Sequence, residues 1–317
     1  MGIVSAILLC RDLELSYDGR RNAVDKLSLE VEEGSLLALV GPNGAGKTST
    51  LRMMATLQEP TSGTLSIAGA DVKQQPALAR ERVGYLPDHF ALYDSMTPVG
   101  YLEFFARLYG VSDKERDSRI EALLSEFDLV HKRNERISSL SRGMRQRLGI
   151  AKTLVHQPKL LLLDEPASAL DPGARMRLRD VLLGLKKRGL AMVVSSHILP
   201  DLAELADKVA ILEGGKLVRY GNVHDVAHGI SSGRIFYTLE VGDPERTRKA
   251  LALLGGRVGE IVEHPGGKLD VELDGGRDTV AELVEKIVLA GGRLYRIAPK
   301  ESALESIYRQ SAAVATA

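Results

Sequence analysis

The stretch Gly41-Pro42-Asn43-Gly44-Ala45-Gly46-Lys47-Thr48 decides the fold of this 317-residue chain. An apolar run at residues 36–40 precedes it, and a segment of helical character through Met53 and Met54 follows it. Glycines let a backbone curl so that successive N–H groups face a phosphate, and a helix start adds partial positive charge there. Strand, loop and helix together are the context of a Walker A loop. A chance glycine-rich turn with this pattern occurs in roughly one chain in a hundred of this length, so we interpret the loop as a nucleoside triphosphate site.

Each part of this loop has an expected task. Lys47 should reach the β- and γ-phosphates, and the hydroxyl of Thr48 should bind Mg²⁺. The residues expected to hold the nucleotide are Gly41, Pro42, Asn43, Gly44, Ala45, Gly46, Lys47, Thr48 and Ser49. The loop alone does not say which class of phosphate-binding protein this is.

Two further apolar runs predict the sheet around the loop. Residues 160–163 precede Asp164, and residues 191–194 precede Ser195-Ser196-His197. Continuous rather than alternating apolar character predicts strands that are buried on both faces, as in a parallel sheet covered by helices. Polar residues follow each run at its carboxyl end, where ligands bind in open α/β sheets. The sequence therefore predicts an α/β fold with a mostly parallel sheet.

The rest of the chain predicts a helical insertion and a second domain. Strand-like runs are missing from about residues 90–156, which we interpret as helices inserted into the α/β core. From residue 231 the pattern restarts as strands at 235–241, 258–263, 268–273 and 293–297, with helices at 244–254 and 279–290. The second of these helices should bury one apolar face made of Val280, Leu283, Val284, Ile287 and Val288. The order βαββαβ predicts a small ferredoxin-like α+β domain at 231–317, after a first domain at 1–230.

Composition and charge narrow the function. Lysine plus arginine and aspartate plus glutamate number 42 each, so no whole-chain charge attracts nucleic acid, and no nucleic-acid partner is expected. The one cysteine, Cys10, lies in an apolar stretch and is expected to be a buried, inert thiol in a reducing cytosol. We interpret the apolar start as the approach to a first strand, not a signal peptide, and we expect no membrane-spanning helix.

Acidic residues follow the four-leucine strand at 160–163. Asp164 is placed to hold Mg²⁺ through water, and Glu165 to orient the attacking water or accept its proton. Asp164-Glu165-Pro166 alone would be a capped turn. After such a strand, in a chain with a Walker A loop, the hydrolytic interpretation is favoured.

The run Leu140-Ser141-Arg142-Gly143-Met144 predicts a second anion site. Ser141 has the position of a helix N-cap, with the helix running to residue 154. A helix start with a serine and a glycine favours an anion. This site cannot serve the phosphates that the first loop already encloses, but it can serve those of a second copy.

Taken together, residues 137–172 resemble the ATP-binding cassette (ABC) ATPases, and the resemblance covers about residues 1–228. It implies the P-loop NTPase fold of an ABC cassette, ATP and Mg²⁺ as cofactors, and a homodimer that closes head to tail on two ATP molecules. Each site would join residues of one copy to Ser141 and Gly143 of the other. The residues of the first copy would be Lys47, Thr48, Asp164, Glu165 and His197.

The resemblance also assigns three peripheral residues. Tyr17 stands where an aromatic ring stacks on adenine, although an ordinary strand aromatic is the alternative. Asp171 belongs to the D-loop at 168–171, and with Pro172 it also predicts a helix start. His197 has the position of the switch histidine that contacts the γ-phosphate.

Several positions depart from the family pattern. Asp88 stands where a lid glutamine is usual; it can approach Mg²⁺ or water but cannot donate a hydrogen bond. Arg142 and Met144 replace the commonest glycine and glutamine of the signature. Ala169 replaces a glycine in the D-loop.

Residues 84–87, 92–93, 96–97, 101–110 and 143–147 resemble exporter-type subunits. These work with a separate membrane permease, which implies a cytoplasmic, peripheral location on the inner face of the membrane. Phe90 and Tyr93 are the expected permease contacts, whereas most of the aromatic residues Phe104, Phe105 and Tyr109 are expected in the core. The alternatives are a non-transport ABC ATPase of translation or DNA repair, and a regulatory module with weak ATPase activity.

Overall fold

The structure is a computed structural model that describes residues 6–168, 170–196, 202, 205–223, 234–274 and 276–299. The chain divides into two compact units, Met1–Gly221 and Asn222–Ala317. Each unit has its own hydrophobic core. The domain boundary predicted near residue 230 lies outside the described residues and stays a prediction.

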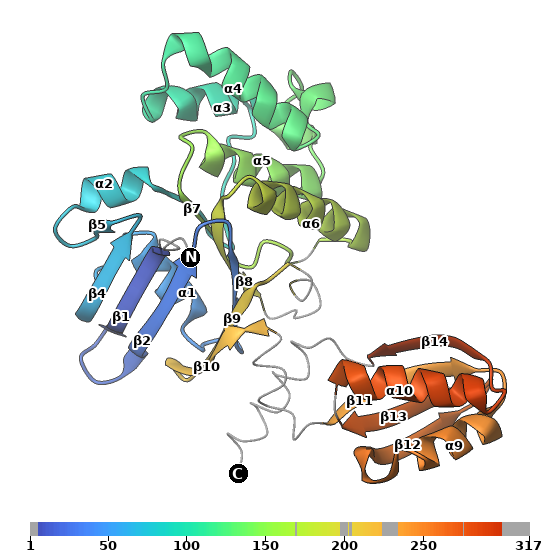
Figure 1. The fold of residues 1–317 in the computed structure, drawn as a ribbon. Coiled ribbons are helices and arrows are strands. Elements are labelled where there is room, and N and C mark those ends of the chain that lie inside the picture. Colours follow the sequence, from blue (N-terminus) through green and yellow to red (C-terminus); the bar gives the residue numbers. More distant parts are fainter. Residues whose placement is uncertain are drawn as a thin grey trace. The chain divides into compact units, whose positions relative to one another are not determined.

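Among the described residues of the first unit, ten strands form one sheet in the order β5-β4-β1-β2-β10-β9-β3-β8-β7-β6 (Figure 1). Their bounds are β1 Ala6–Ser16, β2 Asn22–Glu32, β3 Leu36–Val40, β4 Ser62–Ile67, β5 Ala70–Asp71, β6 Val83–Leu86, β7 Leu160–Leu163, β8 Ala191–Ser196, β9 Lys208–Glu213 and β10 Lys216–Asn222.

One end of this sheet is parallel and the other is antiparallel. Strands β6, β7, β8, β3 and β9 run parallel, with registers such as Leu37 opposite Val193. Strands β1, β2, β4 and β5 pair antiparallel. The parallel part confirms the predicted α/β fold, whereas the antiparallel extension was not predicted.

Burial on both faces explains the continuous apolar runs. Every residue of β3 is buried, and Leu37 and Leu39 share one core with Leu51 of helix α1 (Lys47–Met54). All four leucines of β7 are fully buried as well. Apolar strands with helices on both faces therefore position the polar strand ends, as expected for such a sheet.

Helices occupy the predicted insertion. They are α3 Pro98–Leu108, α4 Asp113–Glu126, η1 Val130–Lys132, η2 Ile137–Ser139 and α5 Arg142–Leu154. The other helices of this unit are α1, α2 Pro76–Glu81 and α6 Pro172–Lys187. Helices α3 and α4 lie against each other and against α5, beyond the end of the sheet (Figure 1).

The aromatic residues of the insertion are less buried than the sequence predicted. Tyr101 is buried, and Phe105 packs edge to face on it. Phe104 and Tyr109, however, are 45% and 46% exposed. The expectation that most of these rings lie in the core was wrong, because the buried residues of α3 are Pro98, Tyr101, Leu102 and Ala106, and neither Phe104 nor Tyr109 belongs to this buried face.

The second unit confirms the predicted ferredoxin-like topology. Its elements are β11 Arg234–Val241, α9 Pro244–Ala252, η3 Gly255–Arg257, β12 Val258–His264, β13 Lys268–Asp274, α10 Gly276–Leu289 and β14 Leu294–Pro299. In the described part of this unit the sheet order is β12-β13-β11-β14, with every neighbour antiparallel. Leu251 of α9 and Leu283 of α10 pack on the same sheet face. Val288 is 61% exposed, so its placement on the buried face of α10 was wrong.

Two expectations from composition can be compared with the structure. Cys10 is buried in β1, and burial raises the pKa of its thiol far above the usual range, as an inert thiol requires. Within the described ranges, no helix has both the length and the apolar character needed to cross a membrane.

Candidate functional site

The glycine loop between β3 and α1 is tightly wound. Gly46 has a φ of 100°, and a Cβ there would lie 2.5 Å from the carbonyl oxygen of Ala23. A Cβ on Gly41 would lie 2.3 Å from the carbonyl oxygen of Leu212. Both positions therefore require glycine, for conformation at the first and for space at both.

Helix α1 begins at Lys47 without a side-chain cap, so its first amides are not bonded by a capping group. The Nζ of Lys47 donates to the carbonyl oxygen of Gly41 at 2.6 Å and lies 3.6 Å from Oε1 of Glu165. A cavity of about 230 Å³ lies at this helix start. It is lined by Ala23, Pro42, Asn43, Gly44, Ala45, Gly46, Lys47, Thr48, Ser49, Asp88 and Glu165. We call it the phosphate cavity, because uncapped amides and a lysine favour an anion.

Strand β7 delivers two acids to different places. Glu165 lines the phosphate cavity, whereas Asp164 is almost fully buried behind it. The Oγ of Ser195, at the end of β8, donates to Oδ1 of Asp164 at 2.6 Å. The same Oγ accepts a hydrogen bond from the backbone N–H of Glu165 at 2.8 Å. One hydroxyl thus fixes both acidic residues.

Ser195 is a residue of this site that the sequence analysis did not predict. A signal was present, because Ser195 is a polar residue at the carboxyl end of an otherwise apolar strand, next in the sheet to the strand that ends in Asp164. His197 lies outside the described residues.

The acidic residues fit a hard divalent cation. Within the described part of the chain, Oδ2 of Asp164 is buried and has no hydrogen-bond partner. Thr48 and Asp88 supply further oxygen atoms at the phosphate cavity, and oxygen ligands are those that Mg²⁺ prefers. Burial, together with the nearby Asp164 carboxylate, raises the pKa of Tyr85 to about 12, so this neighbouring phenol stays neutral.

Tyr17 lies at the outer end of the loop. It is exposed, and its hydroxyl lies 3.1 Å from Oγ of Ser49. It lines a second hollow with Asn22 and Gly215, and that hollow shares Ala23 and Gly44 with the phosphate cavity. An exposed aromatic ring beside the phosphate cavity can stack on the base of a nucleotide whose phosphates occupy that cavity.

The signature run confirms the predicted helix start. Helix α5 begins at Arg142, and Oγ of Ser141 accepts from the N–H of Met144 at 3.3 Å. Asp171 caps α6 in the same way, through the N–H of Ala174 at 2.9 Å. The two helix starts are neighbours, because a Cβ on Gly143 would lie 3.0 Å from Cβ of Ala174. Ser141, Gly143 and Asp171 do not line the phosphate cavity of their own chain.

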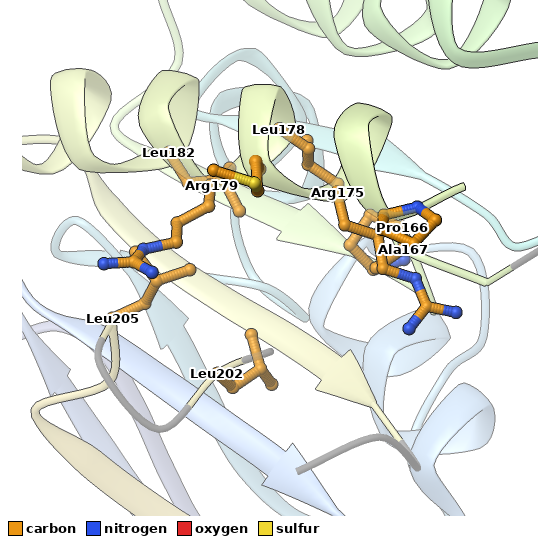
Figure 2. Close-up of a pocket in the computed structure, with 10 residues that line it drawn as sticks. Pro166, Ala167, Arg175, Leu178, Arg179, Leu182, Leu202 and Leu205 are labelled. Atoms are coloured by element: carbon orange, nitrogen blue, oxygen red, sulfur yellow. The ribbon is translucent and has the colours of Figure 1, made fainter. Parts of the chain in front are cut away.

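A further hollow lies below α6 (Figure 2). Its lining is largely apolar and includes Leu178, Leu182, Leu202 and Leu205. Pro166, the residue directly after Glu165, also lines it. Figure 2 shows the guanidinium groups of Arg175 and Arg179 extending in opposite directions, so they do not converge on one anion.

Comparisons with known proteins agree with this geometry. The family model described as "ABC transporter" matches residues 24–168. The ABC transporter ATP-binding protein YhcH of Bacillus subtilis is 32% identical over 286 residues, which are 90% of this chain and 89% of YhcH. The Nod factor export ATP-binding protein I of Cupriavidus metallidurans is 35% identical over 223 residues, covering 70% of this chain and 73% of that protein. A solved structure of an ATP-binding subunit of an ABC transporter has 31% identity and a TM-score of 0.64, and covers 70% of this chain and 92% of that one. The chain therefore belongs to the ATP-binding subunits of ABC transporters and is an ATPase.

Proposed function

We propose that the chain is the ATP-hydrolysing subunit of an ABC exporter and that it powers a separate membrane permease. The similarity to a Nod factor export protein supports the direction of transport. Exposed aromatic side chains on the helical insertion, among them Tyr93 and Phe104, offer apolar surface for a permease. Attachment through the permease would hold the subunit at the inner face of the membrane.

The active unit that we propose is a homodimer with two composite sites. The observation that carries this proposal is the separation of Ser141 and Gly143 from the phosphate cavity of their own chain. The capped start of α5 is an exposed anion site, and a second copy placed head to tail supplies the missing phosphates. Asp171, beside it at the start of α6, would lie at the same interface.

Each chain residue then has a chemical task. Lys47 would leave the carbonyl oxygen of Gly41 and bind the β- and γ-phosphates, and Tyr17 would stack on the adenine. Mg²⁺, when bound, supplies charge neutralisation of the triphosphate, and Thr48, Asp164 and Asp88 would hold it. Glu165 would accept a proton from the attacking water at a carboxylate oxygen. His197 would contact the γ-phosphate.

Replacement of Glu165 with Gln tests the hydrolytic assignment. The amide keeps the size of the side chain but cannot accept the proton, so turnover should fall by about 10²–10⁴-fold. ATP should still bind, and the variant should accumulate as an ATP-dependent dimer in size-exclusion chromatography with light scattering. Glu165→Gln combined with Lys47→Ala is the matched control, and it should stay monomeric. Wild-type turnover in Glu165→Gln would show that another group is the base.

A membrane pull-down tests the exporter assignment. Full-length chain should retain an integral membrane protein from solubilised membranes, and a paired Tyr93→Ser, Phe104→Ser variant should retain less of it. A more exposed apolar pair on the second unit, Leu253→Ser and Tyr295→Ser, is the control. Recovery of ribosomes or DNA instead would favour the non-transport class.

A further inference from the structure

Two departures from the family pattern have opposite charges. Asp88 replaces the usual lid glutamine, and Arg142 replaces the commonest signature glycine. In the proposed head-to-tail dimer, the first residue lines the phosphate cavity of one copy and the second stands at the helix start of the other copy. The charge added on one side is thus the opposite of the charge added on the facing side.

Asp88 adds a negative charge to a cavity in which the one other carboxylate of the described lining, Glu165, already lies 3.6 Å from Lys47. It lines the phosphate cavity together with Glu165. Its side chain is 40% exposed, and Oδ2 lies 3.6 Å from Nε2 of His89, whose side chain is 97% exposed. A triphosphate in this cavity would add like charges beside Asp88, and the two positive charges of Mg²⁺, which Asp88 would help to hold, offset only part of the negative charge of the triphosphate and the carboxylates.

Arg142 places a positive charge, unpaired among the described residues, at a helix start. It is the first residue of α5 and is exposed, and the first turn of α5 contains no acidic residue. A cation at a helix N-terminus opposes the helix dipole. Farther along the same helix, Arg145 pairs with Asp94 at 2.9 Å and Arg147 with Asp128 at 3.1 Å. The guanidinium of Arg142, in contrast, makes no hydrogen bond or ion pair with any residue that the structure describes.

We propose that Arg142 of one copy forms an ion pair with Asp88 of the other copy across the ATP site. The inference rests on the proposed dimer. The planar guanidinium neutralises the lid carboxylate as the two copies close, and each charge offsets the cost that the other has alone. The pair is thus a closure contact that forms only between subunits, and it selects partners that carry both residues.

Mixing of two charge-reversed variants tests the ion pair. Both chains carry Glu165→Gln so that dimers persist; one also carries Asp88→Lys and the other Arg142→Glu. Each homodimer then faces like charges twice, whereas the heterodimer contains one wild-type pair and one reversed pair. With Mg·ATP and chains of distinguishable mass, native mass spectrometry should show heterodimers in roughly tenfold excess over the statistical proportion. The excess should shrink at high salt.

Arg136 provides the matched control, since it is an exposed arginine six residues before Arg142 in sequence. Asp88→Lys mixed with Arg136→Glu should give far fewer heterodimers than Asp88→Lys mixed with Arg142→Glu. Equal, statistical mixing in both experiments would overturn the ion pair while leaving the dimer intact. If the Glu165→Gln parent forms no ATP-dependent dimer, the proposed function is overturned, and the ion pair with it.

Discussion

Ser195 shows how much one hydroxyl can organise. It is fully buried, and it both donates to Asp164 and accepts from the N–H of Glu165. The second oxygen of Asp164 has no partner among the described residues and stays available for a cation. Ser195 therefore orients the acid without taking up its second oxygen, as outer-shell groups do in metal sites.

Removal of this hydroxyl should affect both stability and turnover. Ser195→Ala leaves Oδ1 of Asp164 buried and unpaired, which should lower the free energy of unfolding by about 1.5–3 kcal/mol. ATP turnover at saturating Mg²⁺ should fall roughly 10–100-fold, because Asp164 and Glu165 lose a common support. Urea unfolding and steady-state ATPase assays measure the two effects.

The surface variant Ser62→Ala is the control for Ser195→Ala, since its hydroxyl donates to Glu14 far along the antiparallel part of the sheet. It should change neither quantity appreciably. Unchanged turnover in Ser195→Ala would mean that Ser195 supports only the fold.

At the scale of elements, helices α3 and α4 of the insertion differ in whether the N-cap side chain makes a hydrogen bond. At the start of α3, Oγ1 of Thr97 accepts a hydrogen bond from the N–H of Gly100 at 3.2 Å. Pro98, which follows Thr97 directly, is the first residue of the helix. Ser112 stands at the same position of α4, but its side chain makes no capping hydrogen bond. Helix α4 instead begins with Asp113 and Glu115, which favour the positive helix end.

This difference predicts unequal costs for two similar substitutions. Thr97→Ala should lower the free energy of unfolding by about 1 kcal/mol, because an orphan N–H loses its acceptor. Ser112→Ala should cost only a few tenths of a kcal/mol. Chemical denaturation of both variants measures the difference, and an equal loss in the two would show that backbone conformation, not the side-chain bond, decides these helix starts.

At the scale of the whole molecule, the hydrophobic cores of the two units share none of the residues that the structure describes. Only the first unit contains the phosphate cavity. A ligand that binds one folded unit stabilises that unit by mass action, while a separate core elsewhere in the chain gains nothing directly.

Calorimetry of the full chain should therefore show two transitions. Non-hydrolysable ATP with Mg²⁺ at a hundredfold excess over its dissociation constant should raise one midpoint by roughly 5–10 °C and leave the other in place. A chain ending at residue 230 should lose the ATP-insensitive transition. A single transition that moves as a whole would show that the two units unfold together.

Local signals in the sequence were enough for much of this architecture. The cap at Ser141 and the βαββαβ order each depend on residues close together in the chain, and both were predicted. The apolar start predicted a first strand, but the antiparallel pairing of that strand was not predicted. β1 pairs with β4 across a long stretch of sequence, with Leu8 opposite Ile67, and the hairpin of β1 and β2 was not recognised, although Ser16 lies opposite Asn22. Phe104 was misplaced for a related reason: helical spacing says which residues share a face, but not whether another element covers that face.

The backbone conformation of Glu165 affects how this protein can evolve. Its φ of 48° lies in the left-handed region, which costs a residue with a side chain roughly 1–2 kcal/mol relative to glycine. Glutamate codons become glycine codons by a single nucleotide change, so a more relaxed backbone is always one mutation away, and that mutation removes the carboxylate that we propose as the base. A mutational library can be scored separately for protein abundance and for transport. Glu165→Gly should be enriched by the first score and depleted by the second, and the two scores should differ more at position 165 than elsewhere.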